Sequence, residues 1–344
     1  MCLVKEVVVY EKLPNKLVRC GACQWRCSIS PDQWGYCQTR TNKNGKLYSV
    51  IYGVVSSVNL DPIEKKPVFH YKPGSSCFSL GTYGCNFRCK FCLNYSISYK
   101  KGISVNTDEK ELLSPGEAIK MAKEAKAQGI AWTYNEPAIW LEYTADCAKL
   151  AKQKNLYTCW VTNGYATKEA IDYIAPYLDI YRVDLKSFDD QFYRQLINIR
   201  HAAGVFESTK HVHDKHPKIH IECVTNIIPT WNDDEDNLKR IANWVVVNLG
   251  KKTPWHVTRF FPTAELTGVP STPPETLFKA RQIGMKEGLE FVYIGNFEVD
   301  KEDDTFCPKC GSLAIKRDNY SIEIMNVDQT GHCKTCGEDL NMVM

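Results

Sequence analysis

Three cysteines lie close together near the end of the first quarter of the chain and could ligate a metal. Cys85, Cys89 and Cys92 follow the spacing C-x3-C-x2-C. A closed tetrahedral metal site takes four ligands, so either a distant cysteine completes this set or one metal position stays open. Three thiolates can bind three irons of a [4Fe-4S] cluster and leave the fourth iron free. The cysteines follow an apolar run typical of a strand, and this context favours the open cluster over a zinc loop.

The last four cysteines of the chain form two knuckles. Cys307 and Cys310 belong to the segment "CPKCG", and Cys333 and Cys336 belong to "CKTCG". Paired C-x2-C motifs, each followed by glycine, predict a tetrahedral four-cysteine site. We expect zinc in a ribbon, with a rubredoxin-type iron as the alternative, because both metals accept four sulfurs in a tetrahedron.

The first four closely spaced cysteines form another complete set. Cys20, Cys23, Cys27 and Cys37 follow the spacing C-x2-C-x3-C-x9-C. This irregular spacing suits both zinc and a second iron–sulfur cluster, and structural zinc is the first expectation. Four free thiols would be unusual in a chain without a disulfide context.

Composition excludes several classes of protein. The chain has 344 residues and a net charge of +3 from 43 basic and 40 acidic residues, a balance that does not indicate nucleic acid. Its first residues do not resemble a signal peptide, and no stretch approaches the ~18 apolar residues of a membrane helix. With 16 cysteines, ligation is a better explanation than disulfides. We therefore expect a cytoplasmic protein in a reducing, anaerobic cell.

Two features are expected to be structural. Cys77, Cys159 and Cys223 fall in apolar runs that predict strands, where an inert buried thiol is the usual outcome. Residues 201–220 hold five of the eight histidines, and such a run most often forms a solvated helix and loop.

Strands and helices alternate through the middle of the chain, which predicts parallel strands joined by helical crossovers. The fold class is therefore α/β, a partial TIM-like barrel of six or seven βα units with cysteine-rich metal modules at both ends. The expected domains are residues 1–70, 71–300 and 301–344. The expected strands are 75–80, 130–134, 157–164, 180–186, 219–228, 255–261 and 291–295, and the expected helices are 114–129, 139–154, 167–178, 191–197, 236–250 and 273–288.

The segment "CNFRCKFC", residues 85–92, resembles the signature of the radical S-adenosylmethionine (SAM) superfamily, with the aromatic Phe91 before the last cysteine. The resemblance implies that the amino and carboxylate groups of SAM chelate the open iron. It also implies that an electron passed to the sulfonium gives methionine and a 5′-deoxyadenosyl radical.

Further motifs resemble the SAM-binding stretches of this superfamily. Glu136 lies in "TYNEP", where relatives carry Gly-Gly-Glu-Pro, and is implied to hold the SAM ammonium. "TNG" and "DLK" resemble stretches of glycyl-radical activating enzymes such as pyruvate formate-lyase activase. Independently, a zwitterionic amino acid needs one anion and one cation as partners. The resulting cofactor-binding set is Phe91, Glu136, Thr162, Asn163, Asp184 and Lys186.

A wider resemblance, over nearly the whole chain, is to AmmeMemoRadiSam-type radical SAM proteins. It does not supply a substrate. The segments that carry it, besides "TYNEP" and the cysteine blocks, are residues 60–75, 184–193, 227–233 and 256–262.

The resemblances imply a radical SAM oxidoreductase that abstracts hydrogen from a protein or peptide, with a low-potential electron donor such as ferredoxin or flavodoxin. The alternative is radical modification of a small molecule or a nucleic acid. An alternative of another class is a zinc-ribbon adaptor without catalytic activity. The intact cysteine triad and Glu136 speak against this adaptor.

Overall fold

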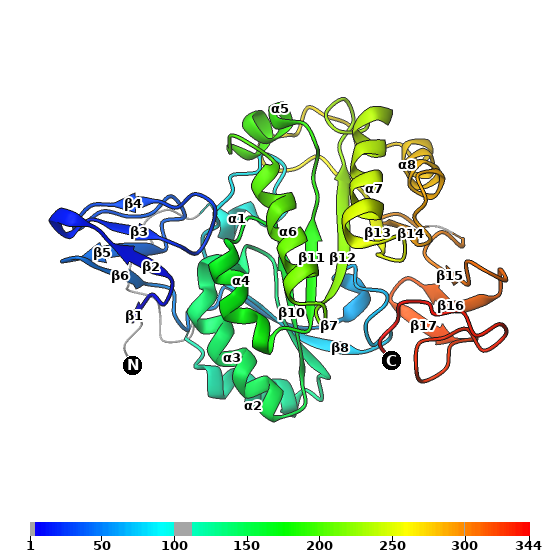
Figure 1. Cartoon of the computed structure of the whole chain (residues 1–344), viewed down its shortest axis with the longest axis horizontal. Coiled ribbons are helices and arrows are strands. Elements are labelled where there is room, and N and C mark those ends of the chain that lie inside the picture. Colours follow the sequence, from blue (N-terminus) through cyan, green and yellow to red (C-terminus); the bar gives the residue numbers. More distant parts are fainter. Residues whose placement is uncertain (1–3, 100–111, 299) are drawn as a thin grey trace.

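The computed structural model describes residues 4–99, 112–298 and 300–344, and its centre is an open sheet of eight strands (Figure 1). The strand order is β14-β13-β12-β11-β10-β9-β8-β7. Strands β8 to β14 are parallel, as predicted, whereas β7 pairs antiparallel with β8 at the edge. The strands are β7 (Ser57–Pro62), β8 (Ser76–Gly81), β9 (Gly129–Trp132), β10 (Tyr157–Thr162), β11 (Ile180–Asp184), β12 (His220–Ile227), β13 (Trp255–Arg259) and β14 (Val292–Gly295).

Helices connect the parallel strands and cover one side of the sheet, so the partial barrel predicted from the sequence is confirmed. Neighbouring helices pack against each other in chain order, and Figure 1 shows α3, α4, α6 and α7 in front of the strands. Ser114 and Glu117 form the expected capping box of α2. The helices are α1 (Tyr95–Ser98), α2 (Pro115–Glu124), α3 (Leu141–Gln153), α4 (Lys168–Ile174), α5 (Asp190–Phe192), α6 (Ala203–Lys215), α7 (Glu235–Leu249) and α8 (Pro274–Lys286), with short 3-10 turns at Pro14–Lys16, Ile63–Lys65, Pro137–Trp140 and Ala175–Tyr177 and a π turn at Tyr193–Ile197.

The parallel strands β8 to β14 are buried on both faces, as a parallel sheet between helices and a filled interior requires. Trp132, Trp160 and Trp255 are among the largest fully buried side chains. The thiols of Cys77, Cys159 and Cys223 have no exposed surface, as expected for cysteines inside these strands.

The parallel arrangement brings the carboxyl ends of the strands to one mouth of the barrel. The motifs of the sequence analysis all follow or end strands: the cysteine triad follows β8, "TYNEP" follows β9, "TNG" begins at the last residue of β10, and "DLK" begins at the last residue of β11. Their side chains therefore meet at this mouth, where barrel active sites lie.

The opposite end of the barrel is closed by a buried polar cluster around Glu222. Its carboxylate accepts hydrogen bonds from the backbone N–H groups of Phe69 (2.9 Å) and His70 (2.8 Å) and lies 2.7 Å from Nε2 of His256. Burial opposes ionisation of Glu222, but His220 and His256 outweigh it and hold the pKa of the carboxyl below its usual value. His256 is therefore a packing residue rather than a residue of the mouth.

Small antiparallel sheets flank the barrel. The C-terminal module shares a hydrophobic core with Phe69, Phe291 and Tyr293. No helix within the described ranges is both long and apolar enough to cross a membrane. The flanking strands are β1 (Lys5–Glu6), β2 (Tyr10–Lys12), β3 (Val18–Cys20), β4 (Ser28–Ile29), β5 (Arg40–Lys43) and β6 (Lys46–Ser49) at the N-terminal end, and β15 (Thr305–Phe306), β16 (Leu313–Asp318) and β17 (Ser321–Ile324) at the C-terminal end.

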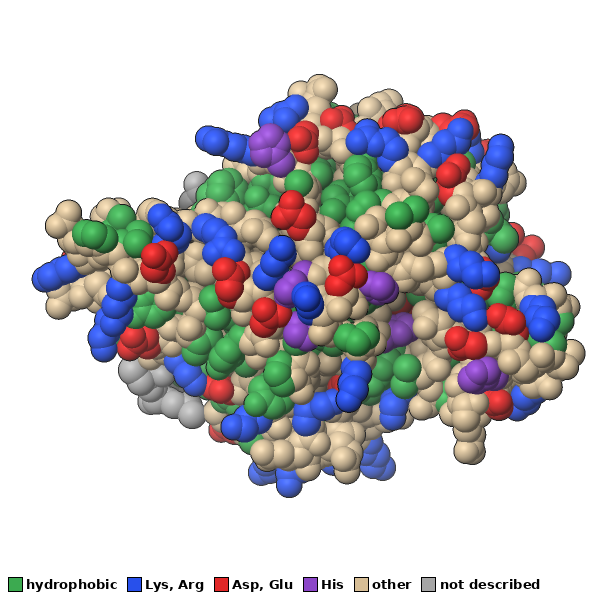
Figure 2. All heavy atoms as spheres, in the orientation of Figure 1, with side chains coloured by type: hydrophobic (Ala, Val, Ile, Leu, Met, Phe, Trp, Pro, Cys, Tyr) green, Lys and Arg blue, Asp and Glu red, His purple; other side chains and the backbone are tan. Residues whose placement is uncertain are grey.

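The histidine-rich run forms α6 and the turn after it. Nε2 of both His211 and His216 lies 2.7 Å from the same oxygen of Asp172 on α4, so the run ties two helices together. Figure 2 shows histidines near the centre of this face, with acidic and basic side chains interspersed around them. This pattern agrees with the expected solvated helix and with the balanced charge of the chain.

Candidate active site at the mouth of the barrel

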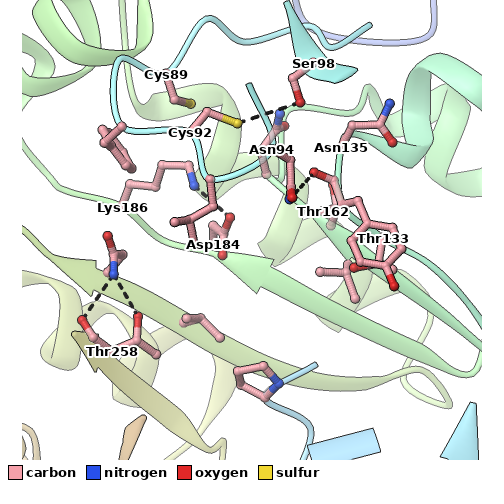
Figure 3. Close-up of a pocket in the computed structure, with 18 of the residues that line it drawn as sticks. Cys89, Cys92, Asn94, Ser98, Thr133, Asn135, Thr162, Asp184, Lys186 and Thr258 are labelled. Carbon is pink, nitrogen blue, oxygen red and sulfur yellow. Dashed lines mark hydrogen bonds and ion pairs between the residues drawn. The ribbon is translucent and has the colours of Figure 1, made fainter. Parts of the chain in front are cut away.

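A cavity of about 360 Å³ lies at the carboxyl ends of the strands (Figure 3). Loops after β8, β9, β10, β11 and β13 contribute to its wall. The structure brings together every residue that the sequence analysis placed at this site. The predicted residues that line the cavity are Cys85, Phe91, Cys89, Cys92, Glu136, Thr162, Asn163, Asp184 and Lys186.

The loop that carries the cysteines is held by backbone contacts to a distant turn. The N–H of Arg88 donates to the carbonyl of Ile197 (3.1 Å), and the N–H of Lys90 donates to the carbonyl of Leu196 (2.8 Å). Gly84 begins the loop with a φ of +85°, and a Cβ at this position would lie 2.5 Å from Cγ2 of Thr39. The loop therefore needs glycine here both for its conformation and for its close approach to the N-terminal module.

Side-chain amides fix the cysteine loop to the loops that follow β9 and β10. Nδ2 of Asn135 donates to the carbonyl of Gly84 (2.7 Å), and Nδ2 of Asn163 donates to Oδ1 of Asn86 (2.7 Å). Asn163 was predicted as a SAM contact, and the structure also gives it the task of holding the cysteine loop. Sequence reasoning missed Asn86, although its place beside Cys85 was a usable signal.

Tyr134 takes a backbone conformation that usually requires glycine. Its φ is +73°, in the left-handed region that L-residues seldom adopt. The hydroxyl of Tyr134 donates to Oδ2 of Asp61 (2.9 Å), and its carbonyl accepts from Nδ2 of Asn94 (2.7 Å). These contacts hold the strained turn in the shape that a glycine would take freely.

Glu136 is buried and its carboxylate is already surrounded by donors. It accepts hydrogen bonds from the N–H of Ala138 (2.9 Å), the hydroxyl of Thr162 (2.8 Å) and the N–H of Asn163 (2.8 Å), and only 1% of the residue is exposed. Burial raises the pKa of Glu136 to about 7, and these donors lower it only in part. Glu136 therefore fixes two strand ends to each other, and a role as partner of the SAM ammonium stays a prediction.

Asp184 lies between two cations. Nζ of Lys186 lies 2.7 Å from Oδ2 of Asp184, and Arg182 binds the other carboxylate oxygen. Burial opposes ionisation of Asp184, but Arg182 and Lys186 outweigh it and hold the pKa of this carboxyl below its usual value. Arg182 was missed by sequence reasoning, although its position two residues before Asp184 puts both side chains on one face of the strand.

The cysteine triad faces this charged group. Figure 3 shows Cys89 and Cys92 above Lys186 and Asp184. Burial raises the pKa of Cys89 to about 12, and the positive charge of Lys186 opposes this rise. In the described part of the chain, no fourth cysteine lines the cavity. One buried and two half-buried thiols, a nearby cation and open space beside them fit a four-iron cluster that keeps one iron free.

The mouth has a second wall, formed by β12, β13 and the loop after β13. Asn226 on β12 and Thr258 on β13 line the cavity and are joined by a 3.2 Å hydrogen bond from Nδ2 of Asn226. Arg259 and Phe261 lie beside them. Thr258, Arg259 and Phe261 lie in the segment 256–262 that carries the wider resemblance, whereas Asn226 lies outside these segments and only the register of the sheet places it at the site.

The C-terminal cysteines form a compact group. The four sulfurs lie within 4.8 Å of one another, with 3.6 Å between Cys307 and Cys336 and 3.7 Å between Cys310 and Cys333. Zinc–sulfur bonds of ~2.3 Å in a tetrahedron put sulfurs about 3.8 Å apart. This group could therefore hold one metal ion.

Replacing Cys310 by serine should release this metal from the full-length protein. Cys310 is the exposed member of the group, so the change removes a ligand without opening the hydrophobic core. We expect about one metal ion fewer per chain and a lower melting temperature, because such a small module depends on its metal. Elemental analysis of the purified protein distinguishes zinc from iron. Ser321→Ala, at an exposed position of β17, is the control, and an unchanged metal content in Cys310→Ser would contradict the assignment.

Comparisons with known proteins agree with this geometry. The sequence model of the Radical SAM superfamily matches residues 79–245. An uncharacterized protein of Methanocaldococcus jannaschii is 38% identical over 99% of this chain and 100% of its own length. The pyruvate formate-lyase-activating enzyme of Clostridium pasteurianum is 28% identical over 46% of this chain and 65% of that enzyme. The crystal structure of a radical SAM methyltransferase from Sphaerobacter thermophilus has a TM-score of 0.51 at 16% identity, over 64% of this chain and 66% of that one, and supports the fold.

Proposed function

The chain belongs to the radical SAM superfamily and is an enzyme of that class, and we propose that it cleaves SAM to abstract hydrogen from a protein or peptide. The superfamily implies a four-iron cluster and SAM. The observation that carries the proposal is the convergence of Cys85, Cys89 and Cys92 on a cavity that also holds Asp184 and Lys186.

The residues of the mouth have distinct tasks in this proposal. Cys85, Cys89 and Cys92 hold the cluster, which when bound supplies the electron that converts SAM to methionine and a 5′-deoxyadenosyl radical. Asp184 and Lys186 offer one anion and one cation to the zwitterionic end of SAM. Phe91 supplies an apolar surface beside Lys186, whose Nζ lies 5.9 Å from the ring centroid.

Glu136→Gln tests the predicted role of Glu136 as a partner of the SAM ammonium. The glutamine amide nitrogen would replace one of the two carboxylate oxygens, so the N–H of either Ala138 or Asn163 would face another donor. We expect a loss of about 1–3 kcal/mol in the free energy of unfolding for a donor left without an acceptor. SAM affinity should fall about tenfold or more, because a charge-assisted contact contributes ~1.5–3 kcal/mol.

Urea unfolding and calorimetric SAM binding without a reductant measure the two effects of Glu136→Gln separately. Glu265→Gln, at an exposed position, is the matched control. Unchanged SAM affinity would remove Glu136 from the binding site and leave it as a structural residue.

The substrate class rests on similarity to an activating enzyme. The name of that enzyme gives a protein, pyruvate formate-lyase, as its target. We extend only this class of substrate, a protein or peptide, to this chain. A low-potential electron donor such as ferredoxin or flavodoxin would complete the reaction. A reducing cytoplasm stays an expectation from the cysteine content of the sequence. Radical chemistry on a small molecule or nucleic acid is the competing proposal.

Fractionated cell extract distinguishes these substrates. With reconstituted enzyme, SAM and dithionite, a macromolecular fraction should raise the rate of 5′-deoxyadenosine formation above the rate without substrate. Protease treatment of the fraction should remove the stimulation, and nuclease treatment should not. Stimulation by the small-molecule filtrate alone would contradict a protein or peptide substrate.

A further inference from the structure

The N-terminal cysteines surround a small cavity of their own. Cys20, Cys23, Cys27 and Cys37 all line it, and its volume is about 10 Å³. A cavity of this size has room for about one water-sized sphere. A zinc ion held by ~2.3 Å bonds to four sulfurs leaves no such space between them. The four cysteines therefore face one common space, and the distances between their sulfurs decide which metal group fits it.

The separation of the sulfurs favours a cluster over a single metal ion. Among the described residues, no three of these four N-terminal sulfurs lie within 4.8 Å of one another. The four C-terminal sulfurs do. The cysteine triad at the barrel mouth also lacks such close spacing. The N-terminal set thus resembles the triad, whose superfamily implies a cluster, and differs from the C-terminal set, whose spacing fits a single ion.

The wall of the cavity contains one buried donor without an acceptor. Arg40 lines the cavity with only 1% of its surface exposed. Its terminal nitrogens bind Glu142, at 2.9 Å for Nη2, but among the described residues its Nε has no hydrogen-bond partner. Buried donors nearly always have acceptors. The sulfurs of an iron–sulfur cluster accept hydrogen bonds from such N–H groups, and these bonds tune its potential.

The remaining wall is apolar and reaches the cysteine loop of the barrel. Trp25 and Tyr36 line the cavity and stack with 4.1 Å between ring centroids. Nε1 of Trp25 donates to the carbonyl of Asn86 (2.8 Å), next to Cys85. An apolar shell with few polar groups is the surrounding that limits solvent access to a cluster.

We propose that Cys20, Cys23, Cys27 and Cys37 hold a second, four-iron cluster and not zinc. Each sulfur would ligate one iron, so this cluster is closed and binds no SAM. Arg40 donates its free Nε hydrogen to a sulfur of the cluster. Structural zinc was the first expectation from spacing alone, and the separation of the sulfurs and the free donor favour the other alternative.

Metal counting tests the proposal independently of SAM cleavage. The triple variant Cys85→Ala/Cys89→Ala/Cys92→Ala should retain about four irons per chain after anaerobic reconstitution, because the second cluster has four ligands of its own. It should show the electron paramagnetic resonance signal of a reduced four-iron cluster, and one equivalent of a C-terminal metal. Two zinc ions without cluster iron would overturn the proposal, as would a two-iron cluster. Changing Cys20 and Cys37 to serine as well should remove the remaining cluster.

Arg40→Lys in the same triple variant tests the hydrogen bond that Nε of Arg40 is proposed to donate to the cluster. The lysine keeps the positive charge near Glu142 and removes the Nε hydrogen. We expect the reduction potential of the remaining cluster to shift to a more negative value, because a hydrogen bond to the cluster stabilises its reduced form. Arg19→Lys on β3, whose side chain is 46% exposed, is the control. An unchanged potential would overturn the role of Arg40 while leaving the metal count to decide the cluster itself.

Discussion

Alanine at Cys85, Cys89 or Cys92 is expected to abolish 5′-deoxyadenosine formation. Each change removes one of only three protein ligands, and the described residues offer no spare cysteine in the cavity. The variant should lose about four irons per chain relative to the wild type, as the loss of one four-iron cluster requires. The C-terminal metal should stay, because its four ligands are intact.

Cys147→Ala is the matched control for this prediction. Cys147 is a fully buried thiol on α3 that lines neither cavity, so its loss should lower stability without changing the iron content. Iron analysis and chromatography of the SAM products measure the result. If all three alanine variants still cleaved SAM at the wild-type rate, the triad would not be the cluster site.

Asp184→Asn should strongly destabilise the protein and weaken SAM binding. The change leaves Arg182 and Lys186 without their shared anion, and removal of one partner from a buried pair costs about 3–5 kcal/mol. The side chain of Asp184 is 25% exposed, so we expect the lower end of this range. Lys186→Met is the control, because it leaves the pair of Arg182 and Asp184 in place and should affect stability less than SAM affinity.

The effect of Asp184→Asn should depend on pH. The pKa of Asp184 is lowered in the folded protein, so its charge contributes stability above the pKa of the unfolded chain. This contribution is lost as the pH falls through the folded-state pKa. Urea unfolding at neutral and acid pH should therefore show the difference between wild type and variant shrinking in acid. A difference that grows in acid would contradict the lowered pKa.

The sequence predicted the parts of the fold that depend on local pattern. The seven parallel strands were visible because each is a short apolar run between helical segments, and the triad was visible from its spacing. A short strand was also expected before the cysteine triad, but its antiparallel pairing with β8 was not visible, because pairing depends on contacts made only in the folded chain. The register that brings Asn226 and Thr258 to the mouth also depends on tertiary contacts.

Prediction of the cysteine sites from sequence was limited in the same way. Their ligand residues were identified from spacing, but spacing does not give the distance between sulfurs, which separates a single ion from a cluster. Glu136 was recognised as a carboxylate of the site, whereas two of its three donors, Thr162 and Asn163, come from the end of the neighbouring strand and meet it only in the folded chain. The shared core of the C-terminal module with Phe69 and Tyr293 joins segments far apart in the chain.

The most direct test of the account is the reaction of the anaerobically reconstituted wild-type enzyme with SAM and dithionite. The expected products are methionine and 5′-deoxyadenosine in equal amounts, with no product when iron is omitted from the reconstitution. An enzyme that holds its full complement of iron and binds SAM, yet forms neither product under these conditions, would contradict the proposed function.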